Sequence, residues 1–348
     1  MNINSNVTVP VGNNFDLLRV LFAGVVFLVH AYVLSGSLML RPLAVFLSSE
    51  IAVKSFFVLS GFLIFMSYEN SSSLGSYFSK RARRIYPAYF TVVMLCAMLG
   101  AFFTQVSVAD YFSVAWLKYI FANLLFLNFI NPDLPGLFST TPMNAVNGAL
   151  WTLKIEVMFY LCVPLFVFWM RKFGRWQVLI GLYAASLCYR VLVEAWGATG
   201  SLIYQELLRQ LPGQLVYFIV GAALYYNLDR FRLHWRWLLG LAILILLVRH
   251  QLPVSWLEPM ALGVVVIYAA CIFPWLGNVG KYGDFSYGIY IVRFPILQVL
   301  IQYGLFDRSP VIAFITATVI VLSISYLSWH FVEKRFLRKS SHYVEVNK

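Results

Sequence analysis

Long apolar runs alternate with short polar segments along the chain from residue 16 to residue 332. A helix needs about 20 mainly apolar residues to cross a hydrocarbon core of about 30 Å, so runs of this length predict membrane-spanning helices. The candidate segments are 16–37, 43–66, 87–104, 113–130, 149–170, 177–195, 213–227, 237–252, 259–277, 285–304 and 311–332. The pattern therefore predicts an all-α fold and a polytopic membrane protein.

Clusters of Lys and Arg between the apolar runs change the count of spans, because cytoplasmic loops of membrane proteins are enriched in these residues. The clusters are Lys80/Arg81/Arg83/Arg84, Arg171/Lys172/Arg175, Arg230/Arg232/Arg236 and Lys334/Arg335/Arg338/Lys339. Strict alternation through eleven spans would place the first cluster opposite the other three. Segment 113–130 resolves the conflict if it lies in the interface, as Lys118 at its centre and Trp116 near its start suggest. We therefore predict about ten transmembrane helices plus one interfacial or re-entrant helix, with both termini in the cytoplasm.

The composition supports the membrane assignment and narrows the class of protein. The chain is 61% hydrophobic and 11% charged, whereas a soluble domain carries about 45–50% apolar and about 25% charged residues. Most of the net charge of +12 lies between apolar runs, which favours a topological signal over nucleic-acid binding. The four cysteines lie inside apolar runs and lack metal-site or disulfide spacing, so we predict no metal and no tightly bound cofactor. We expect a polar cytoplasmic tail over 1–14, a single membrane domain over 15–335 and a second cytoplasmic tail over 336–348.

The first apolar run contains two ionisable residues, Arg19 and His30. Ionisable groups inside spans are costly and usually face a cavity or a partner. Eleven residues make about three helical turns, so both side chains point to one side, about 16 Å apart along the helix axis. We predict Arg19 near the cytoplasmic rim and His30 about two-thirds of the way across. The alternative is that His30 only forms a hydrogen bond to a neighbouring helix.

A carboxylate, Glu156, lies about 10 Å inside the span 149–170 when measured from its non-cytoplasmic start. Its predicted depth therefore matches that of His30. A carboxylate beside an imidazole orients the ring and raises its basicity, so the pair could remove a proton from a hydroxyl group. The alternative is that Glu156 is a structural partner of Lys154 or Arg293.

Arg81 and Arg84 lie in the first basic cluster, which we place in a cytoplasmic loop. On charge alone the cluster is explained as a topology signal. A guanidinium group also offers paired donors to phosphate oxygens, so the same residues could hold a phosphorylated ligand.

Six segments, in this order, resemble the acyltransferase-3 family of integral membrane acyltransferases. In the first of them an arginine precedes a histidine by eleven positions, as Arg19 precedes His30; the third carries an RxxR element at Arg81 and Arg84; the fourth carries an acid at Glu156. The segments are "FDLLRVLFAGVVFLVH", "FFVLSGFLI", "KRARRIYPAY", "LWTLKIEVMFYLCVPL", "YGDFSYGIYIVRFPIL" and "WHFVEKRF".

The resemblance implies an enzyme that moves an acyl group, usually acetyl, from cytoplasmic acyl-CoA to a hydroxyl on an envelope or exported molecule. In such an enzyme Arg19, Arg81 and Arg84 would meet the CoA phosphates. His30 would act as general base, with Glu156 as its partner, and a covalent acyl-histidine is compatible with this scheme but not required. Some donor must hold the oxyanion that forms in the reaction. Four candidates stay open: Ser60, which could also contact acyl-CoA, Asn147, Trp151 and Tyr287.

Three residues depart from the family pattern. Arg293 stands where many members have a histidine, Lys54 stands where an aspartate is frequent, and Lys154 replaces a small residue. Lys54 and Arg293 could contact the oxyanion or an anionic donor or acceptor, or pair with Glu156 or Glu333.

We therefore predict an acyl-CoA-dependent membrane O-acetyltransferase in the bacterial cytoplasmic (inner) membrane. Its partners would be acyl-CoA as co-substrate, a polysaccharide or lipid-linked glycan of the cell envelope as acceptor, and membrane lipids, with no nucleic acid. The sequence does not specify the modified hydroxyl, the acyl chain length or the oligomeric state. The alternative is a transporter or flippase of an envelope precursor, since such proteins also carry charges inside spans, although the two halves show no inverted repeat.

Overall fold

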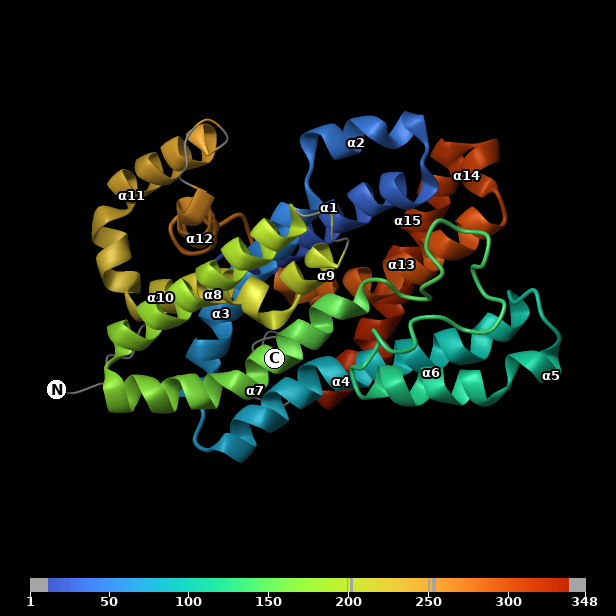
Figure 1. The fold of residues 1–348 in the computed structure, drawn as a ribbon, viewed down its shortest axis with the longest axis horizontal. Coiled ribbons are helices and arrows are strands. Elements are labelled where there is room, and N and C mark those ends of the chain that lie inside the picture. Colours follow the sequence, from blue (N-terminus) through green and yellow to red (C-terminus); the bar gives the residue numbers. More distant parts are fainter. Residues whose placement is uncertain (1–11, 199, 201–202, 250, 252–254, 338–348) are drawn as a thin grey trace. The chain divides into compact units, whose positions relative to one another are not determined.

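The computed structural model describes residues 12–198, 200, 203–249, 251 and 255–337 (Figure 1). These residues form helices and connecting loops, and no strand occurs among them. The α-helices are α1 (Phe15–Ser35), α2 (Arg41–Phe46), α3 (Ser49–Glu69), α4 (Leu74–Leu99), α5 (Val108–Tyr111), α6 (Val114–Leu124), α7 (Leu150–Phe173), α8 (Arg175–Gly197), α9 (Tyr204–Leu208), α10 (Leu211–Tyr226), α11 (Leu228–Val248), α12 (Glu258–Cys271), α13 (Ser286–Gln302), α14 (Leu305–Arg308), α15 (Pro310–Leu327) and α16 (Lys334–Phe336). Short 3₁₀ segments lie at Leu38–Leu40, Gly100–Phe102, Ser255–Leu257 and Val279–Tyr282, and a π-helical segment at Ser328–Glu333 joins α15 to α16.

Eight helical segments among the described residues are long and apolar enough to cross a membrane. They are Phe15–Ser35, Ser49–Glu69, Leu74–Phe102, Leu150–Phe173, Arg175–Gly197, Tyr204–Tyr226, Leu228–Val248 and Pro310–Phe336. Two shorter helices, α12 and α13, occupy the remaining two predicted spans. The predicted fold class is confirmed: the chain is an all-α, polytopic membrane protein.

Three predicted segments differ in detail. The run 43–66 is interrupted at Leu47, which is extended and separates α2 from α3. Helix α6 has 11 residues and is therefore about 16 Å long, too short to cross a bilayer; its position in the interface stays a prediction. The prediction of a basic loop before residue 87 was wrong, because Arg81 and Arg84 lie within α4. Hydropathy identifies only the apolar part of α4. The basic part is helical as well, because Lys and Arg are good helix formers.

The chain forms two compact units, each assembled from separate parts of the sequence. Unit 1 comprises Met1–Leu18, Val53–Tyr77 and Ile155–Asn278, and unit 2 comprises Arg19–Ala52, Phe78–Lys154 and Val279–Lys348. The chain passes from one unit to the other within α1, α3, α4 and α7. The single domain expected over 15–335 stays a prediction. Most of the two predicted tails, residues 1–11 and 338–348, lies outside the described residues, as do Arg338 and Lys339 of the last basic cluster.

In unit 1, α3 packs closely against α10 through two glycines. A Cβ atom on Gly61 would lie 1.9 Å from the carbonyl oxygen of Phe218, and one on Gly221 would lie 2.0 Å from that of Val58. Neither position accepts a side chain without a shift of backbone, so the glycines allow the two helices to touch.

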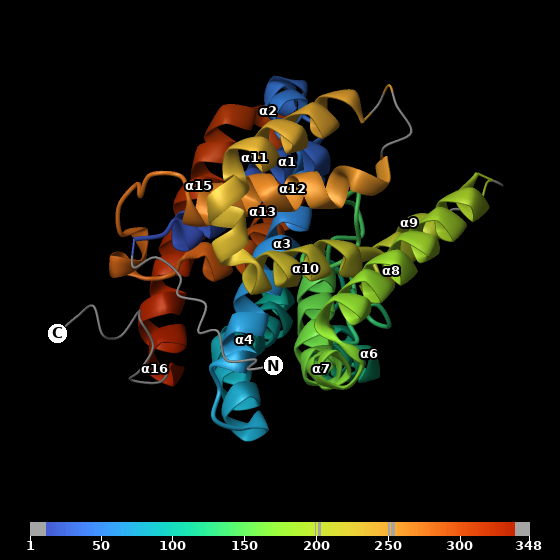
Figure 2. The same ribbon diagram turned by 90° about the vertical axis from the view of Figure 1, so that its left-hand side faces the viewer.

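In unit 2, α13 and α15 lie side by side (Figure 1, Figure 2). Two glutamines on α13 hold the long segment that precedes α7. Gln298 donates to the carbonyl of Ala145 at 3.1 Å, and Gln302 donates to that of Phe103 at 2.7 Å. Within this segment, burial raises the pKa of the Tyr111 phenol, which stays protonated and donates to the Ala97 carbonyl at 2.9 Å. The segment is therefore docked on α13 by specific hydrogen bonds.

Candidate active site

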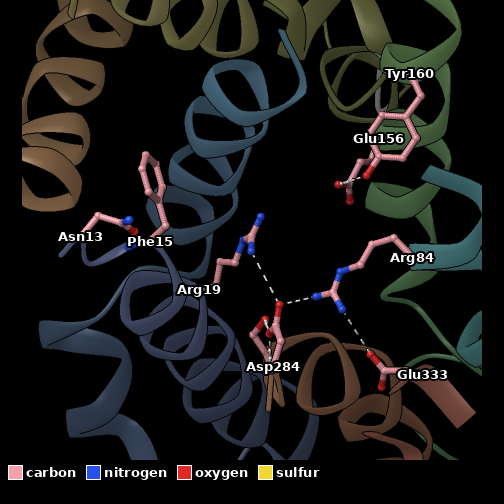
Figure 3. Close-up of polar contacts among 9 residues, drawn as sticks. Asn13, Phe15, Arg19, Arg84, Glu156, Tyr160, Asp284 and Glu333 are labelled. Carbon is pink, nitrogen blue, oxygen red and sulfur yellow. Dashed lines mark hydrogen bonds and ion pairs between the residues drawn. The ribbon is translucent and has the colours of Figure 1, made fainter. Parts of the chain in front are cut away.

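Two of the predicted arginines meet on one carboxylate in unit 2 (Figure 3). Arg19 Nη1 lies 3.6 Å from Asp284 Oδ2, and Arg84 Nη2 donates a hydrogen bond to the same oxygen. The side chain of Asp284 is fully buried, whereas those of Arg19 and Arg84 are 25% and 17% exposed. The carboxylate thus holds two arginines whose side chains are only partly buried.

Asp284 is fixed by its place just before α13. Its Oδ1 accepts hydrogen bonds from the backbone N–H and the hydroxyl of Ser286, in the manner of a capping acid at a helix start. Gly283 precedes it with φ of +125°, and a Cβ there would lie 2.2 Å from Trp329 Nε1. Because that backbone conformation and that space both exclude a side chain, Gly283 sets the turn that delivers Asp284 to the arginines.

A second acid completes the group around Arg84. Glu333 Oε2 lies 3.6 Å from Arg84 Nη1 (Figure 3). Glu333 Oε1 accepts from the Ser328 hydroxyl at 2.9 Å. The Tyr287 ring lies 6.0 Å from the Arg84 guanidinium, and its hydroxyl donates to the Ile85 carbonyl at 3.0 Å. Tyr287 therefore ties α13 to α4 beside the arginine, while its predicted contact with an oxyanion stays a prediction.

The third predicted arginine, Arg81, lies one turn before Arg84 on α4 and is half-buried. Residues three apart on a helix share a face, so both side chains project from one side of α4. The sequence placed these two in the same cluster but gave no sign of Asp284 as their neighbour. The signal that could have found it is a single acid at the start of a span, inside "YGDFSYGIY", in a chain with many more basic than acidic residues.

His30 lies on α1, the helix that also carries Arg19. It is half-buried, and its ring meets the Phe294 ring edge to face with 6.2 Å between centroids. Phe294 in turn covers Gly148, where a Cβ would come within 2.7 Å of the phenyl ring. His30 therefore lies against α13 close to the segment that opens α7.

A proline explains how that segment is anchored. Pro295 has no N–H, so the carbonyl of Ile291 one turn earlier has no donor within α13. Asn147 Nδ2 donates to this carbonyl at 2.8 Å, and Asn147 Oδ1 accepts from Ala149 N at 3.1 Å. The Asn147 amide is thus engaged in structure, and its role toward an oxyanion stays a prediction. Trp151, also half-buried, follows in the first turn of α7.

Arg293 is fully buried on α13. Its Nη1 donates to the Tyr290 carbonyl, and its guanidinium carbon lies 4.0 Å from the centre of the Tyr290 ring. The Tyr290 hydroxyl is bonded to Thr152 Oγ1 at 2.7 Å. Nε and Nη2 of Arg293 have no hydrogen-bond partner among the described residues, and no carboxylate of unit 2 described here forms an ion pair with it. The predicted pairing of Arg293 with Glu333 is therefore not formed.

Glu156 and Ser60 belong to unit 1. Glu156 Oε1 accepts from the Tyr160 hydroxyl at 2.6 Å (Figure 3), and both residues lie on α7 one turn apart. Ser60 is half-buried on α3. His30 belongs to unit 2, so the predicted pair of His30 and Glu156 and the predicted role of Ser60 stay predictions.

Lys54 has an acid partner that the sequence did not suggest. Its Nζ lies 3.3 Å from Glu258 Oε1, at the start of α12, and Tyr217 donates to the other oxygen of Glu258 at 2.9 Å. Lys154, in unit 2, has its ammonium group 4.6 Å from the centre of the Phe129 ring. That Lys54 contacts an anionic substrate stays a prediction.

Comparisons with known proteins agree with these motifs. The acyltransferase-3 model, described as an acyltransferase domain, matches residues 13–330. The chain is 28% identical over 338 residues to the O-acetyl transferase of Shigella phage Sf6, with 94% of this chain and 97% of the relative covered. It is 27% identical over 352 residues to Nodulation protein 10 of Rhizobium leguminosarum, with 92% of each covered. Over 173 residues it is 26% identical to the peptidoglycan O-acetyltransferase OatA of Listeria monocytogenes, which covers 44% of this chain and 26% of the relative.

No solved structure matches the chain. The family model spans nearly all of the described helices, including α1 with Arg19 and His30, α4 with Arg84 and α13 with Arg293. The chain belongs to the acyltransferase-3 family of membrane acyltransferases.

Proposed function

We propose that this protein transfers an acetyl group from acetyl-CoA to a hydroxyl of a cell-envelope glycan or of its lipid-linked precursor. The observation that carries the proposal is the convergence of Arg19 and Arg84 on Asp284 at one end of unit 2, with His30 further along the same helix as Arg19. Family membership and the relatives named as O-acetyltransferases support the reaction type.

The arginine group is suited to the phosphates of CoA. Asp284 holds Arg19 and Arg84 in place, and both side chains are partly exposed. Guanidinium groups bind phosphate oxygens through paired donors, and a fixed group loses less freedom on binding than a mobile one. Arg81 on the same face of α4 adds a third positive charge. The site would bind the donor by its phosphates and leave the thioester free to reach deeper.

The distance from Arg19 to His30 along α1 suits the part of acetyl-CoA that lies beyond its phosphates. His30 lies eleven residues from Arg19, about 16 Å along the helix axis. The narrow pantetheine arm of CoA can follow such a path and present the thioester near the imidazole. His30 would take the proton of the acceptor hydroxyl as its oxygen attacks the thioester carbonyl carbon. The carbon–sulfur bond then breaks, and the CoA sulfur leaves with the proton from the imidazolium.

The two substrates would enter from opposite sides. The basic clusters favour the cytoplasm, and the inner face of a cytoplasmic membrane, for the arginine end of the site. The acceptor would then reach His30 from the other face. The name of the Listeria relative, a peptidoglycan O-acetyltransferase, supports a glycan as the class of acceptor.

The test uses purified full-length protein in lipid nanodiscs, given acetyl-CoA labelled in the acetyl group and an envelope extract containing lipid-linked glycans. Label should move to the glycan fraction with release of CoA. We expect His30→Ala to lower kcat by about 10²- to 10⁴-fold, the usual contribution of a general base. His234→Ala is the matched control, because His234 is an exposed histidine on α11 of unit 1.

Three outcomes would contradict the proposal. The first is a His30→Ala variant that transfers label as fast as the wild type. The second is label that stays in acetyl-CoA with every extract. The third is uptake of a labelled glycan precursor into sealed vesicles without any acyl donor, which would favour the transporter alternative.

A further inference from the structure

Arg293 carries a positive charge that no described carboxylate of unit 2 neutralises. The side chain is fully buried, and a guanidinium group has five N–H donors. One nitrogen donates to the Tyr290 carbonyl, while Nε and Nη2 have no partner among the described residues. Stacking on the Tyr290 ring offsets part of the cost of burial. Buried donors without acceptors are otherwise strongly unfavourable, so this arrangement points to an acceptor supplied by a ligand.

The neighbours of Arg293 indicate which part of the candidate site it belongs to. Tyr290, which packs on the guanidinium, is bonded through its hydroxyl to Thr152 at the start of α7. The next residue of α13, Phe294, packs against His30 of α1. One short stretch of α13 therefore supports both the guanidinium group and the imidazole. The ligand expected there is an oxygen that gains negative charge during the reaction.

We propose that Arg293 is a catalytic residue that donates Nε–H and Nη2–H to the acyl carbonyl oxygen of the bound acetyl-CoA. This inference rests on the proposed function. When the acceptor hydroxyl adds to the carbonyl carbon and gives its proton to His30, the carbonyl π electrons move onto this oxygen. Arg293 stabilises the resulting oxyanion until the carbon–sulfur bond breaks and the carbonyl re-forms.

Two of the other candidates in unit 2, Asn147 and Tyr287, have engaged donors. The Asn147 amide donates to the Ile291 carbonyl, and the Tyr287 hydroxyl donates to the Ile85 carbonyl. Arg293 instead presents two adjacent donors on one planar group, the geometry that matches a single oxygen or a pair of oxygens. Its complete burial also keeps water from competing for the oxyanion.

The test separates a ligand-binding role from a structural one by combining activity with stability. Arg293→Met keeps an unbranched side chain, although a shorter one, and removes the charge. Because a buried charge without an ionic partner is unfavourable, the melting temperature of this variant should equal or exceed that of the wild type. Its kcat should fall by about 10²- to 10³-fold, as when one oxyanion donor is removed. The KM for acetyl-CoA should rise much less than kcat falls, because the phosphates still bind Arg19 and Arg84.

Two further measurements complete the experiment. Arg308→Met is the matched control, since Arg308 is an exposed arginine of α14 in the same unit, and it should change neither property. In thermal-shift assays, acetyl-CoA should stabilise the wild type more than CoA does, and this difference should disappear in Arg293→Met. The acetyl carbonyl is the part of the ligand that only acetyl-CoA supplies.

The outcomes distinguish the two proposals. If the wild type transfers no acetyl group with any extract, the proposed function fails and this inference fails with it. If the wild type is active and Arg293→Met unfolds at lower temperature with activity lost in proportion, Arg293 is structural and only this inference is overturned. Unchanged kcat in Arg293→Met would overturn it as well.

Discussion

Arg84 and Arg293 lie in the same unit, but their positive charges have opposite surroundings. Arg84 contacts two buried acids, Asp284 and Glu333, and its side chain is 17% exposed. Arg293 is completely buried, contacts a carbonyl and an aromatic ring, and has two nitrogens without hydrogen-bond partners among the described residues. The described part of unit 2 therefore supplies acids to the first charge and none to the second.

The difference predicts how the two sites respond to substitution. Removing one member of a buried ion pair leaves the other uncompensated and destabilises the fold. Removing an arginine that has no ionic partner in the described part of its unit relieves an unfavourable burial and costs function instead. Changes at Asp284 should therefore act mainly on stability, and changes at Arg293 mainly on kcat.

The largest effect on stability is expected from Asp284→Ala. It leaves Arg19 and Arg84 facing each other without their shared carboxylate and removes the acceptor of the Ser286 hydrogen bonds. Breaking a buried ion pair costs about 3–5 kcal/mol. Thermal unfolding of the purified protein should show a much lower melting temperature than that of the wild type.

The matched control for this prediction is Asp307→Ala, an exposed acid on α14. Exposed substitutions of this kind usually change stability by less than about 0.5 kcal/mol. Asp284→Asn should fall between the two, because an amide oxygen can still accept from Ser286 but carries no charge. A melting temperature of Asp284→Ala equal to that of Asp307→Ala would mean that the arginines are not held by Asp284.

Local sequence patterns predicted the helices and part of the site. Apolar runs of about 20 residues located the spans because length is fixed by bilayer thickness. The spacing of Arg19 and His30 correctly placed both on one helix, since helical periodicity is a local property. The same reasoning failed for Arg81 and Arg84, because hydropathy does not detect the charged part of a helix that continues beyond the apolar run.

Contacts between distant segments could not be predicted. Asp284 meets Arg19 and Arg84 only because three helices bring them together, and no spacing in the chain encodes that meeting. The link between Asn147 and α13 depends on the Ile291 carbonyl, which has no donor within the helix because Pro295 lacks an N–H. The sequence shows that this carbonyl needs a donor, but not that Asn147 supplies it. The unpartnered donors of Arg293 likewise exist only once its neighbours are known.

A smaller effect on stability is expected from Tyr290→Phe. This variant sharpens the comparison of Arg84 with Arg293, because it leaves the aromatic ring beside Arg293 in place. The change removes the hydrogen bond between the Tyr290 hydroxyl and Thr152, while Thr152 keeps its bond to the Ala149 carbonyl at 3.0 Å. Loss of one such bond typically costs about 1 kcal/mol. The melting temperature should fall slightly and kcat should stay near wild type, whereas Tyr290→Leu, which removes the ring, should lower kcat as well.

The smallest effect on stability is expected from Arg171→Ala in unit 1. This variant tests whether an exposed ion pair stabilises the fold as much as the buried pairs of Asp284 do. Arg171 lies 3.3 Å from Glu69, but its side chain is 57% exposed. Exposed pairs are worth about 0–1 kcal/mol and are weakened further by salt. Glu69 also keeps the hydrogen bond from the Tyr226 hydroxyl at 2.6 Å, so no buried charge is left alone. The melting temperature should match that of the wild type at high salt; a loss as large as that of Asp284→Ala would mean that burial does not decide the worth of these pairs.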